Sequence, residues 1–346
     1  MMNNMQNRFS GEDRNLNATG LSIGYLEKGN YPVVVHENLE LSLQSGELTF
    51  LLGPNGAGKS TLIRTLVGFQ PMLSGEITIA GRSIKGYSEL EYSKLVSVVL
   101  TERSSIGGMT VSELVGLGRY PHTGFFGILR KKDRRIVAKA IEQVGIAELA
   151  AKYISELSDG ERQKAMIAKA LAQETPIIIL DEPTAFLDLP SKIEIMVLLH
   201  KLANETCKSI LLSTHDLELA LQLADRIWLL SKGKALVSGV PEDLVLSGEF
   251  NSFFEREGIL FDKETGSFRI HNPFAKAIHI SGTGIELQWV TNALIRNGFA
   301  PTSNPESEYR IEVSEEDPIE YLVYRNSKKM FTADSIESLL QLLKIS

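Results

Sequence analysis

A glycine-rich segment at residues 53–61 (GPNGAGKST) carries the clearest chemical signal in this chain. It fits the spacing G-x-x-x-x-G-K-[ST] and lies between a predicted strand and a predicted helix. Glycines let the backbone curl so that successive N–H groups point at phosphate oxygens, and the helix start adds its positive end. Lys59 would supply a full charge, and Ser60 would offer its hydroxyl to Mg²⁺. We therefore predict a nucleotide phosphate site formed by Gly53, Pro54, Asn55, Gly56, Ala57, Gly58, Lys59, Ser60 and Thr61.

Two adjacent carboxylates follow a short apolar run further along the chain. Residues 176–180 (PIIIL) predict a buried strand that ends directly before Asp181 and Glu182. Asp181 would then lie beside the phosphate loop, where its carboxylate could hold Mg²⁺ through water. Glu182 would point the other way off the strand end and could reach a water that attacks the γ-phosphate. The alternative is that the acidic pair only caps the following turn, and the phosphate loop upstream argues against it.

A third segment, residues 157–161 (LSDGE), precedes the predicted helix ERQKAMIAKALAQE. Ser158 suits the N-cap position, and Ser158 with Glu161 matches a capping box. For these five residues alone, helix capping is the simpler interpretation. A helix start also binds anions, however, and this one stands just upstream of the PIIIL strand. The residues by themselves leave both interpretations open.

These segments, in this order, resemble the ATP-binding cassette (ABC) ATPases over roughly residues 18–250. The family's signature, LSGGQ, stands where this chain has LSDGE. The resemblance implies ATP and Mg²⁺ as cofactors. It adds Tyr25, Ser158, Gly160 and Glu161 to the cofactor-binding residues, and it implies Glu182 and His215 as catalytic residues and Ser60, Glu102 and Asp181 as metal ligands.

The resemblance also implies a task for particular side chains. Tyr25 would stack on adenine, and His215, in the STHD segment after a predicted strand, would contact the γ-phosphate. Residues 185–188 (AFLD) would cross the interface of a dimer. Glu102 would ligate Mg²⁺ and sense a transmembrane partner.

Three carboxylates depart from the family pattern. Glu102 and Glu161 each stand where the family usually has Gln, and Asp159 replaces the third-position Gly of the signature. Carboxylates near a γ-phosphate would weaken ATP binding by charge repulsion. We therefore expect Asp159 and Glu161 to be turned away, paired or solvated.

The elements that would position these residues alternate short apolar runs with helical stretches, which is typical of a layered α/β domain. Helices are predicted at residues 59–69 and 161–174, and residues 88–156 are predicted to be mostly helical, with an interruption at 118–127. The resemblance implies the fold of a P-loop NTPase cassette with a helical subdomain at about residues 88–160. Strands are predicted at residues 39–43, 47–53, 76–80, 176–180 and 209–213, and a hairpin at 227–230 and 235–238 around Gly233.

The pattern breaks near residues 250–258, and the rest of the chain has an alternation of its own. It is enough for a small α+β domain, either a regulatory module or an inert extension, and its position after the cassette favours the first. We therefore divide the chain into a flexible leader at 1–17, the ABC ATPase domain at 18–257 and the C-terminal domain at 258–346. In the last of these, strands are predicted at residues 268–271, 277–281, 309–313 and 321–325, and helices at 286–297 and 333–345.

Composition narrows the class of protein. The chain has 36 Lys and Arg against 43 Asp and Glu, a net charge of −7, and no basic stripe, which argues against a nucleic-acid partner. The longest stretch without a charged residue, 15–26, is too short and too polar to span a membrane. The N-terminus has no apolar core and no cleavage site of a signal peptide. The lone Cys207 suits a reducing compartment.

Residues 109–127 (MTVSELVGLGRYPHTGFFG) are similar to a segment of the ABC importers for iron–siderophore, haem and cobalamin. The resemblance implies the ATP-hydrolysing subunit of such an importer, peripheral on the cytoplasmic face of the inner (plasma) membrane. Its partners would be transmembrane permease subunits, a substrate-binding protein and a second copy of the chain in a head-to-tail homodimer. A soluble ABC ATPase of translation or DNA repair, or an exporter ATPase, is the alternative.

Overall fold

The computed structural model describes residues 15–26, 31–100, 108–124, 126–254, 259–263, 266–270, 276–314 and 318–345. They form two compact units, one running to Phe254 and one running from Phe268 to the C-terminal end. A two-stranded sheet of β11 (Ile259–Asp262) and β12 (Ser267–Ile270) is assigned to the second unit, except for Ser267. Within the described ranges, none of the helices has both the length and the apolar character that crossing a bilayer requires.

A largely parallel sheet with the strand order β10-β9-β3-β8-β7-β6 forms the centre of the first unit. Its three middle strands are buried at every residue, which is why they are continuous apolar runs. Because parallel strands end at the same edge, the segments that follow β3, β7 and β8 meet there. The strands are β3 (Leu48–Leu52), β6 (Val96–Val99), β7 (Ile177–Leu180), β8 (Ser209–Ser213), β9 (Arg226–Leu229) and β10 (Val237–Gly239).

The hairpin predicted around Gly233 is confirmed, since β10 pairs antiparallel with β9. The helical prediction for residues 88–156 is wrong at β6, which pairs in parallel with β7 from Val96 opposite Ile177. A run of four residues is too short for its own periodicity to decide, so the neighbouring strand decides its conformation.

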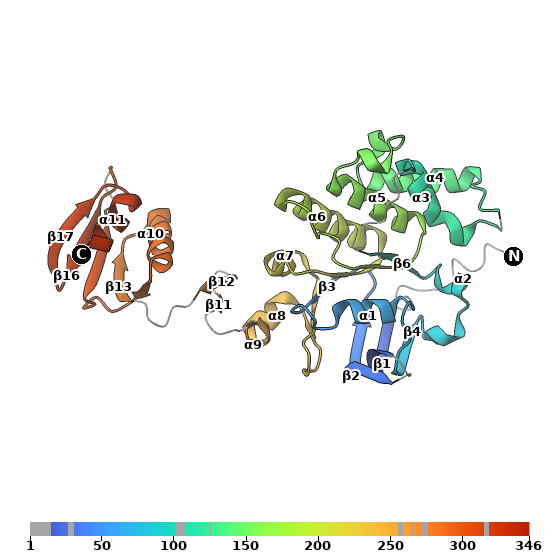
Figure 1. The fold of residues 1–346 in the computed structure, drawn as a ribbon, viewed down its shortest axis with the longest axis horizontal. Coiled ribbons are helices and arrows are strands. Elements are labelled where there is room, and N and C mark those ends of the chain that lie inside the picture. The colour runs from blue at the N-terminus through green and yellow to red at the C-terminus, as the bar shows by residue number, and fades with distance from the viewer. Residues whose placement is uncertain are drawn as a thin grey trace. The chain divides into compact units, whose positions relative to one another are not determined.

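A second, antiparallel sheet lies on the far side of α1 (Lys59–Leu66), in the order β2-β1-β4-β5. Leu62, Ile63 and Leu66 of α1 share one hydrophobic core with residues of both sheets. The helix is therefore held between the two sheets, as Figure 1 shows. The strands of the second sheet are β1 (Leu16–Leu26), β2 (Pro32–Leu43), β4 (Ser74–Ile79) and β5 (Arg82–Ser83).

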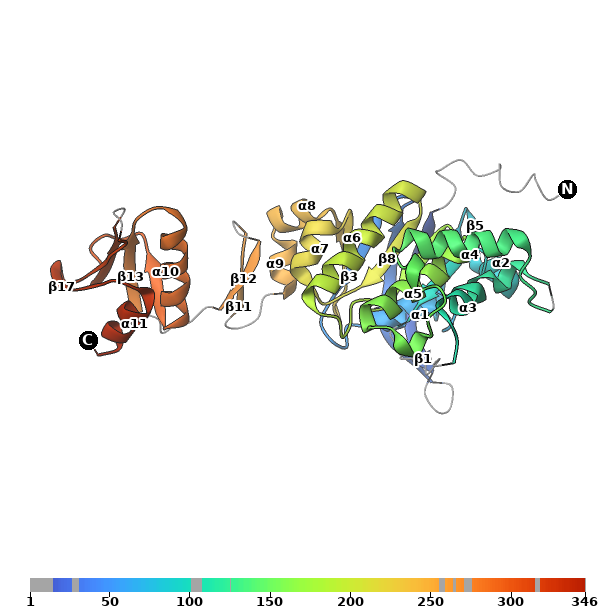
Figure 2. The same ribbon diagram turned by 90° about the horizontal axis from the view of Figure 1, so that it is seen from above.

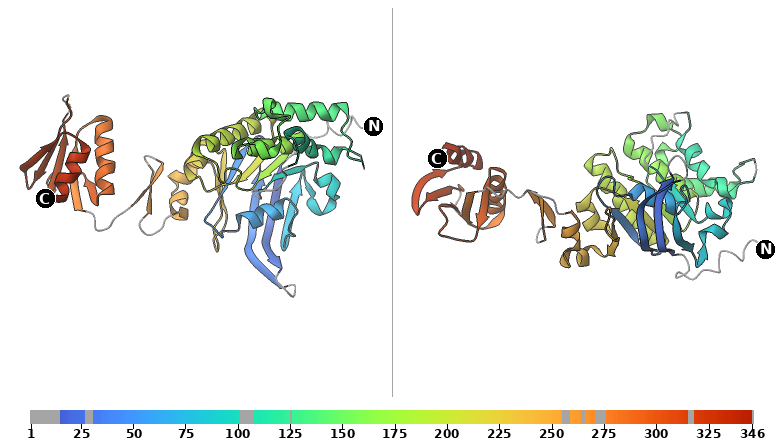
Figure 3. Two further views of the ribbon diagram at one scale, coloured as in Figure 1. Left: turned by 45° about the horizontal axis from the view of Figure 1, so that its top comes forward. Right: turned by 60° about the horizontal axis from the view of Figure 1, so that its bottom comes forward.

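Helices cover the rest of the parallel sheet. α6 (Leu189–Thr206) and α7 (Leu217–Leu223) lie side by side (Figure 2). A helical layer of α3 (Val111–Gly116), the 3-10 helix η4 (Leu117–His122), α4 (Lys131–Gln143) and α5 (Asp159–Ala172) lies on the side of the parallel sheet away from β1 and β2 (Figure 3). The shorter helices are α2 (Glu89–Tyr92), α8 (Pro241–Leu246), α9 (Glu249–Phe254), η3 (Ile84–Gly86), η5 (Ala147–Leu149) and η6 (Ile154–Glu156).

The second unit is a five-stranded sheet with the order β14-β13-β15-β16-β17. Alternate residues of its strands, such as Ile311 and Val323, share a core with Val290 of one helix and Leu339 of the other. Both helices therefore pack on the same face of the sheet. The elements are β13 (Lys276–Ser281), α10 (Gly284–Arg296), β14 (Phe299–Thr302), β15 (Tyr309–Val313), β16 (Tyr321–Arg325), β17 (Lys328–Ala333) and α11 (Ile336–Ile345).

Candidate nucleotide-binding site

The predicted phosphate loop joins β3 to α1, and two of its glycines are required by the backbone. A Cβ on Gly53 would lie 2.1 Å from the carbonyl oxygen of Leu230 on the neighbouring strand segment. Gly58, directly before α1, has φ +96°, a conformation that side chains disfavour. The N-cap residue Gly58 has no side chain that could cap α1, so the first N–H groups and the positive end of the helix can face an incoming anion.

Lys59 is 6% exposed at the start of α1. Its Nζ donates to the carbonyl oxygens of Gly53, at 2.8 Å, and Pro54, at 3.4 Å. The pKa of Lys59 is lowered because burial disfavours the charged form, and the negative charges of Glu182 and Asp181 offset only part of this effect. The ammonium thus lies inside the loop with carbonyl partners that a phosphate oxygen can replace.

Ser213, at the end of β8, joins the two carboxylates that follow β7. Its Oγ donates to Asp181 Oδ1 at 2.6 Å and accepts the backbone N–H of Glu182 at 2.9 Å. The backbone N–H of Asp181 also donates a hydrogen bond to the carbonyl oxygen of Val99 in β6. Glu182 has φ +48°, a left-handed backbone conformation that is uncommon for residues other than glycine. The sequence analysis did not single out Ser213.

His215 lies next to Glu182 at the same edge of the sheet. Its Nε2 is 2.6 Å from Glu182 Oε1, and both side chains are partly exposed, at 45% and 32%. A carboxylate on a water-accessible edge, with an imidazole beside it, can accept a proton and orient a water. The structure therefore brings together Lys59, Asp181, Glu182 and His215, as the sequence predicts.

The side chain of His36 in β2 contacts the phosphate loop. The sequence analysis gave this residue no role. It is 5% exposed, and its Nε2 lies 2.7 Å from the carbonyl oxygen of Ala57. A Cβ on Gly58 would lie 3.2 Å from the His36 ring. The available signal was a histidine after three valines in an otherwise apolar run.

Tyr25 lies near the end of β1 and is 48% exposed. It pairs with Val33, whereas Ile23, two residues earlier, pairs with His36. At about 3.3 Å per residue, Tyr25 is therefore about 7 Å along the strand from the histidine that touches the phosphate loop. An exposed ring at this distance can stack on a base whose phosphates occupy the loop.

The segment predicted as the signature begins α5. Ser158 is the N-cap: its Oγ and backbone N–H both donate to Glu161 Oε2 at 2.8 Å, and it accepts from the Glu161 N–H. These hydrogen bonds lower the pKa of Glu161. Asp159 forms an ion pair with Arg162 at 2.8 Å. Both unusual carboxylates thus have hydrogen-bond or ion-pair partners within the first turn of α5.

Other predicted residues have less defined surroundings. Glu102 lies outside the described residues, so its expected role as a metal ligand stays a prediction. Asn55, Gly56 and Ser60 are exposed at the rim of the loop. Phe186, in the segment predicted to cross a dimer interface, is 73% exposed.

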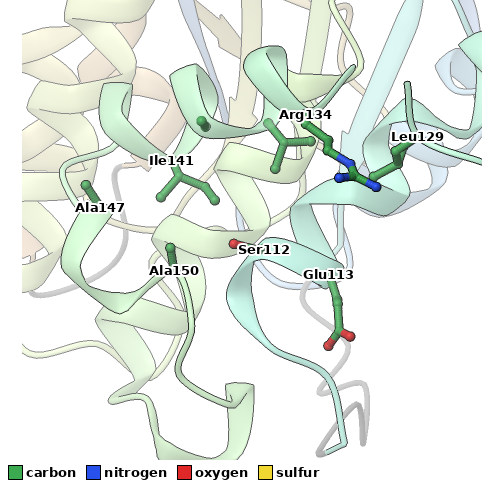
Figure 4. A pocket seen from close by; sticks show the side chains of 9 residues that line it. Ser112, Glu113, Leu129, Arg134, Ile141, Ala147 and Ala150 are labelled. Carbon is green, nitrogen blue, oxygen red and sulfur yellow. The ribbon is translucent and has the colours of Figure 1, made fainter. Parts of the chain in front are cut away.

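A hollow of about 450 Å³ lies in the helical layer, away from the phosphate loop (Figure 4). Its lining is mostly apolar, and Arg134 and Glu113 are its charged members. An apolar hollow with a few charged groups suits a protein segment better than a nucleotide. It is lined by Ser112, Glu113, Leu129, Arg134, Val137, Ala138, Ile141, Ala147 and Ala150.

Two protein-family models match the chain. The model for "ABC transporter" matches residues 36–185, which include the phosphate loop, the signature segment and the Asp181–Glu182 pair. The model "Iron ABC transporter C-terminal domain" matches residues 275–344, which make up most of the second unit.

Curated relatives and solved structures agree with these matches. An uncharacterized ABC transporter ATP-binding protein of Methanocaldococcus jannaschii is 40% identical over 257 residues, 74% of this chain and 87% of that protein. The ferric enterobactin transport ATP-binding protein FepC of Escherichia coli is 39% identical over 225 residues, 65% of this chain and 81% of that protein. The dimeric structure of a bacterial ABC transporter cassette superposes with a TM-score of 0.57 at 26% identity, covering 65% of this chain and 98% of that one.

Proposed function

The chain belongs to the ATP-binding proteins of ABC transporters, and from this membership we propose that its ATP hydrolysis drives import of an iron chelate. We infer an iron chelate as the transported substrate from the match of residues 275–344 to the iron ABC transporter C-terminal domain. Similarity to the ferric enterobactin protein supports it. Haem and cobalamin are the other cargoes of the same import class.

We assign the chemistry to the residues at the carboxyl edge of the parallel sheet. Lys59 and the N–H groups of the phosphate loop bind the phosphates of ATP. Glu182 accepts a proton from the attacking water and orients it, and His215 holds that carboxylate at the open edge. Tyr25 stacks on the adenine.

Mg²⁺ fits the donor set at this edge. The hydroxyl of Ser60 and the carboxylate of Asp181, which Ser213 holds in place, are the hard oxygen donors that this cation prefers. Bound there with ATP, the ion would offset negative charge on the phosphates. Glu102 is the proposed third protein ligand.

A second copy of the chain would complete each ATP site. The signature segment begins α5 in the helical layer, whereas the phosphate loop and Glu182 lie at the edge of the sheet. In a head-to-tail homodimer, Ser158, Gly160 and Glu161 of one copy would face the γ-phosphate bound by the other. The dimeric cassette with a similar fold supports this arrangement.

The helical layer would contact a transmembrane permease, which would hold the subunit at the cytoplasmic face of the membrane. Its apolar hollow could receive a short helix, with Arg134 and Glu113 pairing with charges at the helix ends (Figure 4). A substrate-binding protein on the other side of the membrane would deliver the chelate.

A membrane pull-down with the tagged full-length chain tests this function. We expect a polytopic permease to be recovered, and ATP hydrolysis by the recovered complex to rise when a ferric siderophore and its binding protein are added. A Lys59→Ala chain is the control, because it should recover the permease and hydrolyse nothing. Recovery of ribosomes or DNA in place of a permease would contradict the proposed transport function. Stimulation of ATP hydrolysis by cobalamin or haem alone would contradict the proposed cargo.

A further inference from the structure

The C-terminal end of α5 lies against η4, which contains the GRYPH part of the segment that resembles iron–siderophore importers. A Cβ on Gly118 would lie 2.2 Å from the carbonyl oxygen of Lys169, so only glycine allows this approach. His122 Nε2 lies 2.8 Å from the carbonyl oxygen of Gln173. Two residues of η4, Gly118 and His122, therefore lie against backbone carbonyl groups at the C-terminal end of α5.

Arg119 makes the strongest contacts between η4 and α5, and it is 2% exposed. Its Nη1 donates to the Ala172 carbonyl and to Glu174 Oε2, both at 2.7 Å, and its Nε donates to Asp133 Oδ1 of α4 at 3.1 Å. The last carbonyls of a helix have no partner within the helix, and a cation there also offsets the helix dipole. Arg119 thus caps α5 from a different element.

Glu174 has a backbone conformation that its residue type disfavours. It follows the last turn of α5 with φ +55°, where helices usually carry glycine. A side chain in this conformation costs stability, and such a cost persists where the side chain has another task. The task here is the ion pair with Arg119.

The same turn also contacts the sheet. The Gln173 side-chain amide donates to the carbonyl oxygens of Ser93, at 2.5 Å, and Val96, at 3.2 Å, where β6 begins. Residues 172–174 are therefore a junction between the helical layer and the sheet that carries the ATP chemistry.

The opposite end of α5 is the signature segment. A helix of 14 residues is about 21 Å long, so tilting it by about 5° at the junction would move Ser158 by about 2 Å. A hydrogen bond from Ser158 or a neighbouring N–H group to a phosphate of the partner copy is lost when it lengthens by this amount. The angle held at the junction therefore matters at the ATP site.

We propose that η4 is a socket for the C-terminal end of α5, and that Arg119 and Glu174 are positioning residues that set where Ser158–Glu161 meet the ATP bound by the partner copy. The inference rests on the ATP-dependent dimer of the proposed function. It assigns the GRYPH residues a role inside the cassette, besides any contact with a permease.

The test compares Glu174→Gly with Cys207→Gly, both in a Glu182→Gln chain that binds ATP without consuming it. Glycine at 174 accepts the same backbone conformation and removes the side chain with its carboxylate. Cys207 is the matched control, because it ends α6 with φ +50° and its side chain has no ion pair with Arg119. Nucleotide titration of dilute monomer, sedimentation with ATP and thermal unfolding are measured.

We expect Glu174→Gly to weaken ATP-driven dimerisation about tenfold while ATP binding to the monomer and the unfolding temperature do not fall. Glu174→Gln should be intermediate, and Cys207→Gly should dimerise like its parent. Unchanged dimerisation of Glu174→Gly, or a fall in its unfolding temperature that accounts for the loss, would overturn the inference. Absence of an ATP-driven dimer in the parent would overturn the proposed function, and the inference with it.

Discussion

At the scale of single residues, the site depends on hydrogen bonds that hold each charged group in one place. Lys59 lies buried among loop carbonyls, Asp181 is held by Ser213, and Glu182 contacts His215. Charged groups in such positions need no large rearrangement when ATP arrives, which favours hydrolysis.

Glu182→Gln should lower ATP turnover by about 10²–10⁴-fold, because the amide keeps the shape of the side chain but cannot accept the proton of the water. ATP affinity should stay unchanged in a nucleotide titration. Lys59→Ala is the contrasting variant and should lose ATP binding itself. Turnover of Glu182→Gln within threefold of the wild type would exclude Glu182 as the base.

Ser213→Ala should lower turnover about tenfold and raise the Mg²⁺ concentration needed for half-maximal activity. The variant removes both hydrogen bonds that hold Asp181 and the Glu182 backbone, and one buried hydrogen bond to a charged group is worth about 1.5–3 kcal/mol. Ser209→Ala, at the buried start of the same strand, is the control, since the Ser209 Oγ has no hydrogen-bond partner among the described residues. Equal effects of the two variants on turnover and on the Mg²⁺ requirement would show that the loss comes from altered packing of β8 and not from the two hydrogen bonds of Ser213.

At the scale of elements, the signature helix α5 is stabilised at both ends by side chains. Ser158 and Glu161 form a capping box at its start, and Arg119 donates to the carbonyl oxygen of its last residue, Ala172. The hydrogen bonds from Ser158 lower the pKa of Glu161, so its carboxylate is more easily ionised in the folded state than in the unfolded chain. Stability from this group is present above the unfolded pKa and is lost as pH falls through the folded pKa.

Glu161→Gln should therefore lower the free energy of unfolding by about 0.3–1 kcal/mol at pH 7, and this difference should vanish as pH falls below the ordinary value of 4.5. Thermal unfolding at several pH values measures it. Glu113→Gln is the matched control, because Glu113 forms the same capping box with Thr110 at the start of α3. The two variants should show the same direction of pH dependence, but only Glu161→Gln should change ATP-driven dimerisation. A stability difference that grows on acidification would contradict the assignment.

At the scale of the whole molecule, the described residues of the two units contribute to separate hydrophobic cores. The core between α1 and the sheets contains residues only from the first unit, and the core of α10 and α11 only from the second. Every residue of the candidate ATP site precedes Phe254, where the first unit ends. The two units should therefore fold independently.

A chain truncated after residue 257 should remain folded and bind ATP with unchanged affinity in a nucleotide titration. Calorimetry of the full chain should show two unfolding transitions, of which the truncated chain keeps one. Dimer stability or transport coupling should change instead, as a regulatory second unit requires. Aggregation of the truncated chain, or loss of its ATP binding, would show that the C-terminal residues belong to the core of the first unit.

The sequence by itself determined the chemistry. The phosphate loop, the Asp181–Glu182 pair and His215 could be predicted because each follows an apolar run, and the ends of parallel strands meet at one edge. The ranges of β15 and β16 were predicted to the residue, since buried and partly exposed positions alternate along β15 and along the first four residues of β16.

Only the tertiary structure decided how these groups are held. Ser213, His36 and Arg119 act through partners 14 to 55 residues away in the sequence, and no local pattern reports such pairs. The strand β6 forms because β7 lies beside it. Glu174 adopts its disfavoured backbone conformation at the position where its carboxylate forms an ion pair with Arg119. Local spacing predicts which residues can do chemistry, whereas contacts distant in sequence decide the geometry in which they do it.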